Sequence, residues 1–178
     1  MAGVIDRMRR AALLDSTLYE EVEADPRATW QAVGVVVLSS LGAGIGSGAR
    51  HGIGGVILWT GIVLGVWYIW AYLTYVIGTR FLPEPQTHAD HGELLRTIGF
   101  SSSPGVLRVL GIIPGLRGIV FIVVSVWMLV AMIVAVRQAL DYTSTYRAIG
   151  VCSIGWIAIL ILIFIFASPL SSGIFSAG

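Results

Sequence analysis

The chain has 178 residues, of which 56% are hydrophobic and 12% are charged, and its formal net charge is +1. Its mean hydropathy of +0.87 lies far above the range of soluble domains and indicates an integral membrane protein. The small net charge, with no basic cluster away from the apolar segments, excludes nucleic acid as an expected partner. Cys152 is the only cysteine, which excludes an intrachain disulfide.

Residues 1–27 form a polar segment ahead of the first long apolar run. No short apolar core follows its arginines, so we do not predict a secretory signal peptide. Its apolar residues recur at roughly helical spacing, which favours an amphipathic helix lying on the membrane surface. We expect this segment to be cytoplasmic.

Four apolar runs are long enough to cross a bilayer and almost free of charge: Ala28–Ser47, Ile53–Ile77, Gly118–Val136 and Ala148–Leu170. Asp25 and Pro26 are typical of a helix start, the first as a cap and the second in the first turn. The membrane domain is therefore predicted to occupy residues 28–170, with a short uncharged tail at 171–178. Small residues in and beside the spans favour close helix packing at Gly42, Gly46, Gly61, Gly65, Gly111 and Gly115.

The segment Ile98–Leu116 decides between two topologies, because it is apolar but interrupted by polar residues. If it crosses, the chain has five spans in an all-α bundle; if it is re-entrant, the chain has four. Five spans with a cytoplasmic N-terminus satisfy the positive-inside rule better. The inner side then carries eight arginines and the outer side two, which are respectively Arg7, Arg9, Arg10, Arg27, Arg80, Arg96, Arg137 and Arg147, and Arg50 and Arg117.

A polar site is predicted inside this third segment, where Arg108 follows a serine-rich break. Pro104 removes a backbone hydrogen bond, so we expect a kink there and a protein group that satisfies the freed carbonyl near Phe100. A charged arginine inside a bilayer costs at least about 2.5 kcal/mol and needs a partner or a route to water. The residues of this site are Ser101, Ser102, Ser103, Pro104 and Arg108.

The sequence HADHGE, residues 88–93, permits two interpretations. His88, Asp90, His91 and Glu93 are ligand types that suit a divalent transition metal, although no established zinc spacing is met. The alternative, which we favour, is a helix start with Asp90 as N-cap and Glu93 in a capping box. No cofactor and no catalytic group is predicted, so we do not expect an enzyme.

Two blocks and the spacing of the spans carry a resemblance to a known family. They are YEEVEADPRATWQA before the first span and GELLRTIGFSSSPGVLRVLG at the third. The chain resembles the Yip-domain family, small polytopic proteins known in eukaryotes as Rab-GTPase-interacting proteins of the Golgi and endoplasmic reticulum. The family's DLYGP motif is replaced here by STLYEEV, so a Rab-type GTPase is not an expected partner. The resemblance implies a bacterial member located in the inner membrane.

Two classes of function are consistent with these patterns. The first is a non-enzymatic scaffold or accessory subunit, which contacts the bilayer and other membrane proteins, or a second copy of itself, through helix packing. The second is a small transporter or channel with an ion or anion path near Arg108, or a metal-binding protein that uses His88 and His91.

Overall fold

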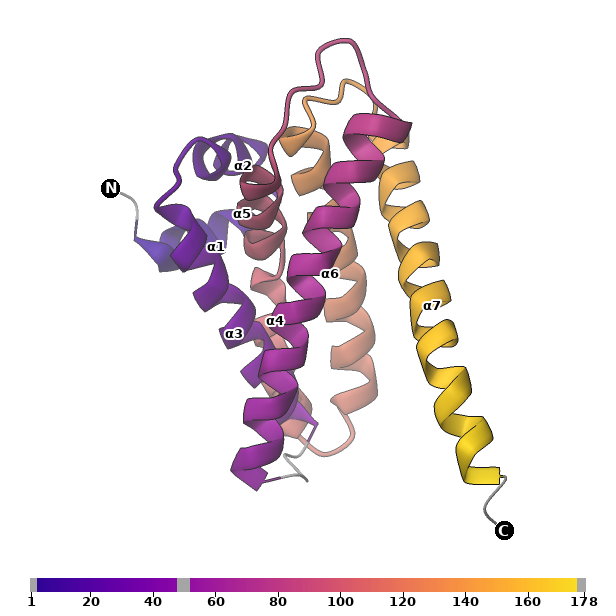
Figure 1. Ribbon diagram of the computed structural model, residues 1–178. Helices are drawn as coiled ribbons and strands as arrows, with labels where there is room; N and C mark the ends of the chain where they lie inside the picture. The colour runs from indigo at the N-terminus through magenta and orange to yellow at the C-terminus, as the bar shows by residue number, and fades with distance from the viewer. Residues whose placement is uncertain (1–2, 48–51, 176–178) are drawn as a thin grey trace.

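The computed structural model describes residues 3–47 and 52–175 of the chain, and within them every regular element is helical. Four long helices run lengthwise through the molecule: α3 (Ala28–Gly46), α4 (Gly52–Val76), α6 (Arg117–Ala139) and α7 (Thr145–Phe175). The loops at 82–90 and 140–144 lie together at one end, the loop end, and the turn at 113–116 lies at the other, the turn end (Figure 1). The prediction of an all-α protein is confirmed for the described residues.

Three of the helical segments are long and apolar enough to cross a membrane: Ala28–Gly46, Gly54–Phe81 and Arg117–Ala139. The second includes a π-helical end, η1 (Ile77–Phe81), which continues α4. The apolar helical stretch of α7 whose side chains are described, Thr145–Ile161, is shorter. The outer surfaces of the long helices are apolar, with exposed residues such as Ile57 and Ile122. This identifies a membrane protein.

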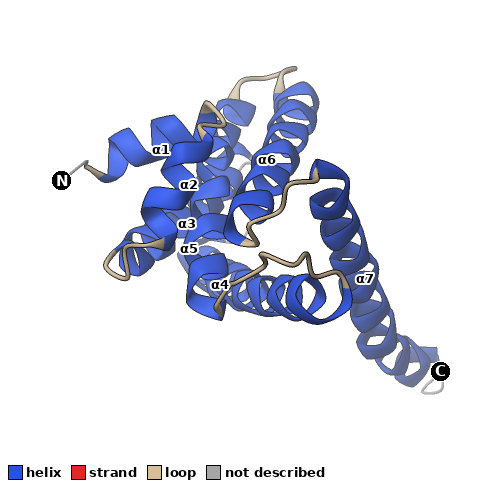
Figure 2. Cartoon of the chain, turned by 90° about the horizontal axis from the view of Figure 1, so that it is seen from above, coloured by secondary structure: helices blue, strands red, loops and turns tan. Residues whose placement is uncertain are grey.

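The polar N-terminal segment folds as two helices, α1 (Val4–Ala12) and α2 (Ser16–Glu23), rather than as one. Leu14 adopts a φ of 61°, which ends α1, and Asp15 then caps α2 by accepting a hydrogen bond from the backbone N–H of Thr17. The pair packs on α5 and α6, on the opposite side of the molecule from α7 (Figure 2). Leu18, Tyr19 and Val22 are fully buried in this contact.

The third apolar segment is broken in the middle, as its sequence suggests. It consists of α5 (His91–Ser101) followed by the 3₁₀ helix η2 (Ser103–Ile112). Pro104 cannot donate to the carbonyl of Phe100, and the Ser103 hydroxyl donates to that oxygen instead at 2.6 Å. The expectation that protein satisfies this carbonyl is confirmed, but the helix changes type rather than only bending.

Glycines allow α3 and η2 to approach more closely than side chains would permit. A Cβ atom placed on Gly46 would lie 1.8 Å from the carbonyl oxygen of Arg108, and one on Gly42 would lie 2.7 Å from that of Val106. A Cβ atom on Gly105 would likewise collide with the hydroxyl of Ser39. The backbone of η2 is therefore fixed against α3 by direct backbone contact.

Candidate functional site

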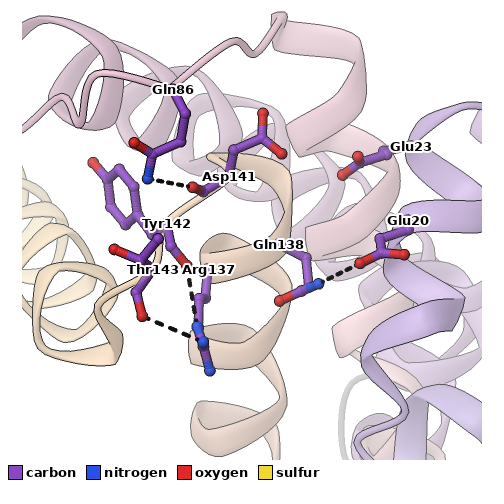
Figure 3. A pocket seen from close by; sticks show the side chains of 8 residues that line it. All are labelled: Glu20, Glu23, Gln86, Arg137, Gln138, Asp141, Tyr142 and Thr143. Carbon is purple, nitrogen blue, oxygen red and sulfur yellow. Dashed lines mark hydrogen bonds between the residues drawn. The ribbon is translucent and has the colours of Figure 1, made fainter.

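The loop end contains an open polar pocket with a volume of about 680 Å³ (Figure 3). Its walls come from α2, the loop at 82–90, the last turn of α6 and the turn that follows α6. Figure 3 shows Glu20 and Glu23 of α2 on one side, with Gln86 and the 141–143 turn on the other. The lining residues are Glu20, Glu23, Gln86, Arg137, Gln138, Asp141, Tyr142 and Thr143.

The far wall of this pocket is held rigidly by Glu84 and Tyr142. Glu84 is 8% exposed and its carboxylate accepts hydrogen bonds from the backbone N–H and the hydroxyl of Thr143, at 3.0 and 2.8 Å. These bonds lower the pKa of the Glu84 carboxyl. The Tyr142 hydroxyl lies 2.7 Å from the carbonyl oxygen of Leu82 and 3.0 Å from that of Gly78. The end of α4 and the α6–α7 turn are thereby joined.

Arg137 and Gln138 connect the pocket to its neighbouring elements. The guanidinium of Arg137 donates to the carbonyl oxygens of Tyr142 and Thr143, and Gln138 donates to the Glu20 carboxylate at 2.9 Å. Arg137 is therefore engaged in holding the turn that follows its own helix.

Glu23 is the unusual member of the pocket. Its Oε2 atom is buried without a hydrogen-bond partner among the described residues. Burial raises the pKa of its carboxyl to about 7, and the negative charges of Asp141, Glu93 and Glu20 act in the same direction. Arg96 is adjacent, but its guanidinium donates to the backbone carbonyls of Val22 and Glu23, which end α2.

The four residues of the predicted metal cluster do not converge on one point. Asp90 and Glu93 form the capping box of α5. The backbone N–H of Asp90 donates to the Glu93 carboxylate at 2.7 Å, and the backbone N–H of Glu93 donates to the Asp90 carboxylate at 2.8 Å. The predicted capping box is therefore confirmed. His88 contacts the carbonyl oxygen of Gln86. His91 packs edge-on against the rings of two tyrosines in α4. Among the described residues no group of three or more metal-ligating side chains comes together.

The serine-rich break and Arg108 occupy different parts of the third segment. The hydroxyls of Ser101 and Ser102 donate to the carbonyl of Ile98, as local backbone bonds. Arg108 lies farther along η2, where its Nη2 donates to the hydroxyl of Ser125 at 2.9 Å. Its guanidinium carbon lies 5.7 Å from the centroid of the Phe121 ring. The structure thus brings Arg108 to α6 and leaves the serines at the α5–η2 junction.

The predicted packing glycines divide into three groups. Gly42, Gly46 and Gly111 lie in tight contacts, the last against the Phe121 ring and α3. Gly115 adopts a φ of +84° and serves the turn at 113–116. Gly61 and Gly65 are exposed on α4, and a Cβ atom on either would meet no described atom within 4 Å.

Sequence reasoning missed the tertiary polar contacts of the N-terminal pair. Arg7 is 6% exposed, pairs with Glu21 and Asp25 at 2.9 and 3.1 Å, and donates to Gln31 at 2.9 Å. The Asp15 cap was the available signal, because a cap in mid-segment implies a second helix that can fold back. No pattern in the sequence indicated which carboxylates would meet Arg7.

No protein-family model, curated protein or solved structure matches this chain.

Proposed function

We propose that this protein is a non-enzymatic, five-span protein of a bacterial inner membrane that acts as a scaffold or accessory subunit. In this proposal a helix of another membrane protein, or of a second copy, packs on the outer face of α4. The observation that carries it is the contrast between two sets of glycines. Gly42 and Gly46 of α3 and Gly105 and Gly111 of η2 lie in tight contacts inside the bundle, whereas Gly61 and Gly65 of α4 face outward.

Glycines four residues apart on an apolar helix permit two backbones to approach closely, and in lipid such packing drives helix association. Gly61 and Gly65 have this spacing, and neighbouring bulky residues on either side, such as Leu58 and Ile69, are also exposed. The resulting surface is an exposed apolar face of α4 that a second helix could approach closely. A partner helix would bury it, whereas lipid chains would contact it with less complementarity.

Five spans are supported by the path of the third segment. It starts at the loop end, follows α3 and α6, and finishes at the turn end (Figure 1). The 11 residues of α5 and the 10 residues of η2 extend over about 36 Å at the rise of each helix type, which exceeds a hydrocarbon core of about 30 Å. With the loop end cytoplasmic, the arginines of that end satisfy the positive-inside rule.

The partner contact is tested by adding bulk to this exposed face of α4. Gly61→Leu and Gly65→Leu should reduce oligomers or co-purifying membrane proteins, as measured by crosslinking in native membranes and by mass spectrometry of what is isolated. The matched controls are Gly34→Leu and Gly118→Leu, which also have room for a Cβ atom but lie on other helices. Loss of association in the controls as well, or in none of the variants, would contradict the proposal.

The topology is tested by cysteine labelling in a Cys152→Ser background. A cysteine at Leu116 should react with a membrane-impermeant maleimide in intact cells stripped of their outer membrane. A cysteine at Gln86 should react only after the inner membrane is opened. Four spans with a re-entrant third segment predict that neither cysteine reacts in intact cells.

Membership of the Yip-domain family is part of this proposal, and it rests on the resemblance of the two sequence blocks. The two blocks that carry the resemblance contact each other, because Arg96 and Phe100 of the second pack on α2 and the start of α3 from the first. A change in one block should therefore be compensated in the other.

A further inference from the structure

Among the described residues, Arg108 has no anionic partner. It belongs to η2, which packs on α3 and α6, and none of these three helices contains an acidic residue. The acidic residues of the N-terminal segment that form ion pairs, Asp15, Glu21 and Asp25, do so with Arg7 and Arg10. The guanidinium has five N–H donors, and its one side-chain hydrogen bond, from Nη2, goes to the neutral hydroxyl of Ser125.

The position of Arg108 is fixed by the backbone rather than by its charge. Its carbonyl group lies against Gly46 of α3, where not even a Cβ atom fits. Its Nε atom is buried without a hydrogen-bond partner among the described residues, and the Phe121 ring lies beside the guanidinium. The side chain is therefore directed along α6 toward Ser125, and its outer nitrogens are the part that an anion could reach.

The outer end of the guanidinium opens toward lipid. Ser125 is exposed, and its neighbours on the same face of α6, Ile122 and Val126, are 68% and 56% exposed. This surface belongs to the apolar segment Arg117–Ala139, which is long enough to span a membrane. An anion at this point would approach from the bilayer and not along a water-filled path.

The depth of the site suits a phospholipid headgroup. Arg108 precedes the last residue of η2 by four residues, and Ser125 follows the first residue of α6 by eight. These separations place the guanidinium about 8 to 12 Å from the turn end. Arginine side chains in such positions reach phosphates by snorkelling and by local thinning of the bilayer.

We propose that Arg108 and Ser125 form a binding site for the phosphate group of an anionic phospholipid in the leaflet at the turn end. The outer guanidinium nitrogens donate to the phosphate oxygens, as arginine does in bidentate phosphate contacts. The Ser125 hydroxyl accepts from Nη2 and can donate its own proton to the same anion. The lipid's hydrocarbon chains then lie along the exposed apolar face of α6. This site is independent of the exposed glycine face of α4.

The test compares lipid retention by the full-length protein isolated in mild detergent. Native mass spectrometry would count phosphatidylglycerol and phosphatidylcholine bound to the wild type, to Arg108→Gln and to Ser125→Ala. We expect the wild type to prefer phosphatidylglycerol, and Arg108→Gln to weaken its binding about tenfold, the effect of losing a hydrogen-bonded charge. Ser125→Ala should weaken it less, and Arg108→Lys should retain part of it. Arg117→Gln is the matched control, because Arg117 lies at the same end and is exposed.

Three results would overturn the proposal. The first is unchanged phosphatidylglycerol binding in Arg108→Gln. The second is displacement of the lipid by millimolar inorganic phosphate, which would identify a site for a free anion. The third is loss of an oligomer instead of a lipid, which would identify a carboxylate of another subunit as the partner. If Arg108→Gln does not fold, phosphatidylglycerol binding is compared between the wild type, Ser125→Ala and Arg108→Lys instead. Unchanged binding in both variants would then overturn the proposal.

Discussion

Replacing Glu23 with glutamine should remove a pH dependence from the docking of the N-terminal helix pair. The docked carboxyl has a pKa of about 7, against 4.5 for a free glutamate. Because the docked state binds the proton more tightly, docking is most stable below about pH 4.5. The docking free energy becomes less favourable as the pH rises from about 4.5 to about 7, and it does not change further above that range.

The size of the effect follows from the same shift. The full pKa difference corresponds to about 3 kcal/mol of docking free energy, and partial solvation of the pocket reduces this to about 1 to 2 kcal/mol. Local opening of α2 should therefore increase roughly tenfold between pH 4 and pH 8.5 in the wild type. Glu23→Gln cannot ionise and should show a flat profile, with tighter docking than the wild type at pH 8.5.

Hydrogen exchange of the α2 amides in lipid nanodiscs, corrected for the intrinsic effect of pH, measures this opening. Asp6→Asn is the control, because Asp6 is exposed and lies on the neighbouring helix. The reasoning would be refuted if the wild-type opening were independent of pH, or if Glu23→Gln kept the wild-type slope. Equal flattening by Asp6→Asn would show that net charge, and not the buried carboxyl, is responsible.

Three further predictions concern the bundle itself. Gly46→Ala should lower the thermal midpoint measured by tryptophan fluorescence in detergent, because its Cβ would collide with a backbone carbonyl of η2, whereas Gly44→Ala meets no described atom within 4 Å and should be neutral. Ser103→Ala should cost about 0.5 to 1.5 kcal/mol, since the carbonyl of Phe100 loses one of its two donors, and replacement with threonine should recover much of that in a chemical denaturation series. Tyr142→Phe should cost about 1 kcal/mol and increase proteolysis of the 82–90 loop, which its hydroxyl helps to hold; unchanged cleavage would contradict that role.

Sequence reasoning succeeded where local chemistry decides the structure. The boundaries of α3 and α6 follow from where the apolar runs stop. The start of α5 follows from the spacing of Asp90 and Glu93, which is that of a capping box. The need for another donor to the carbonyl oxygen of Phe100 follows from the absence of an N–H group on Pro104. Each of these depends on residues within a few positions of one another.

It failed where residues distant in the sequence meet. Whether Glu20, Glu23 and Asp141 share a pocket depends on how α2 docks on α5 and α6. The kink expected at Pro104 is instead a change to a 3₁₀ helix, because serine hydroxyls also compete for the nearby carbonyls. The sequence likewise could not show that Gly46 is used in the bundle whereas Gly61 is not, since each belongs to a pair of glycines four residues apart in an apolar helix.

The contact between Arg96 and the end of α2 has a consequence for biosynthesis. It joins Arg96 to the carbonyl of Val22, 74 residues earlier in the chain. When α2 emerges from the ribosome, the segment that caps it has not been made, and neither has α6, which forms part of its binding surface. Leu18, Tyr19 and Val22 therefore remain uncovered until the third and fourth apolar segments have been inserted. The first helices to be synthesised are thus among the last to reach their final position.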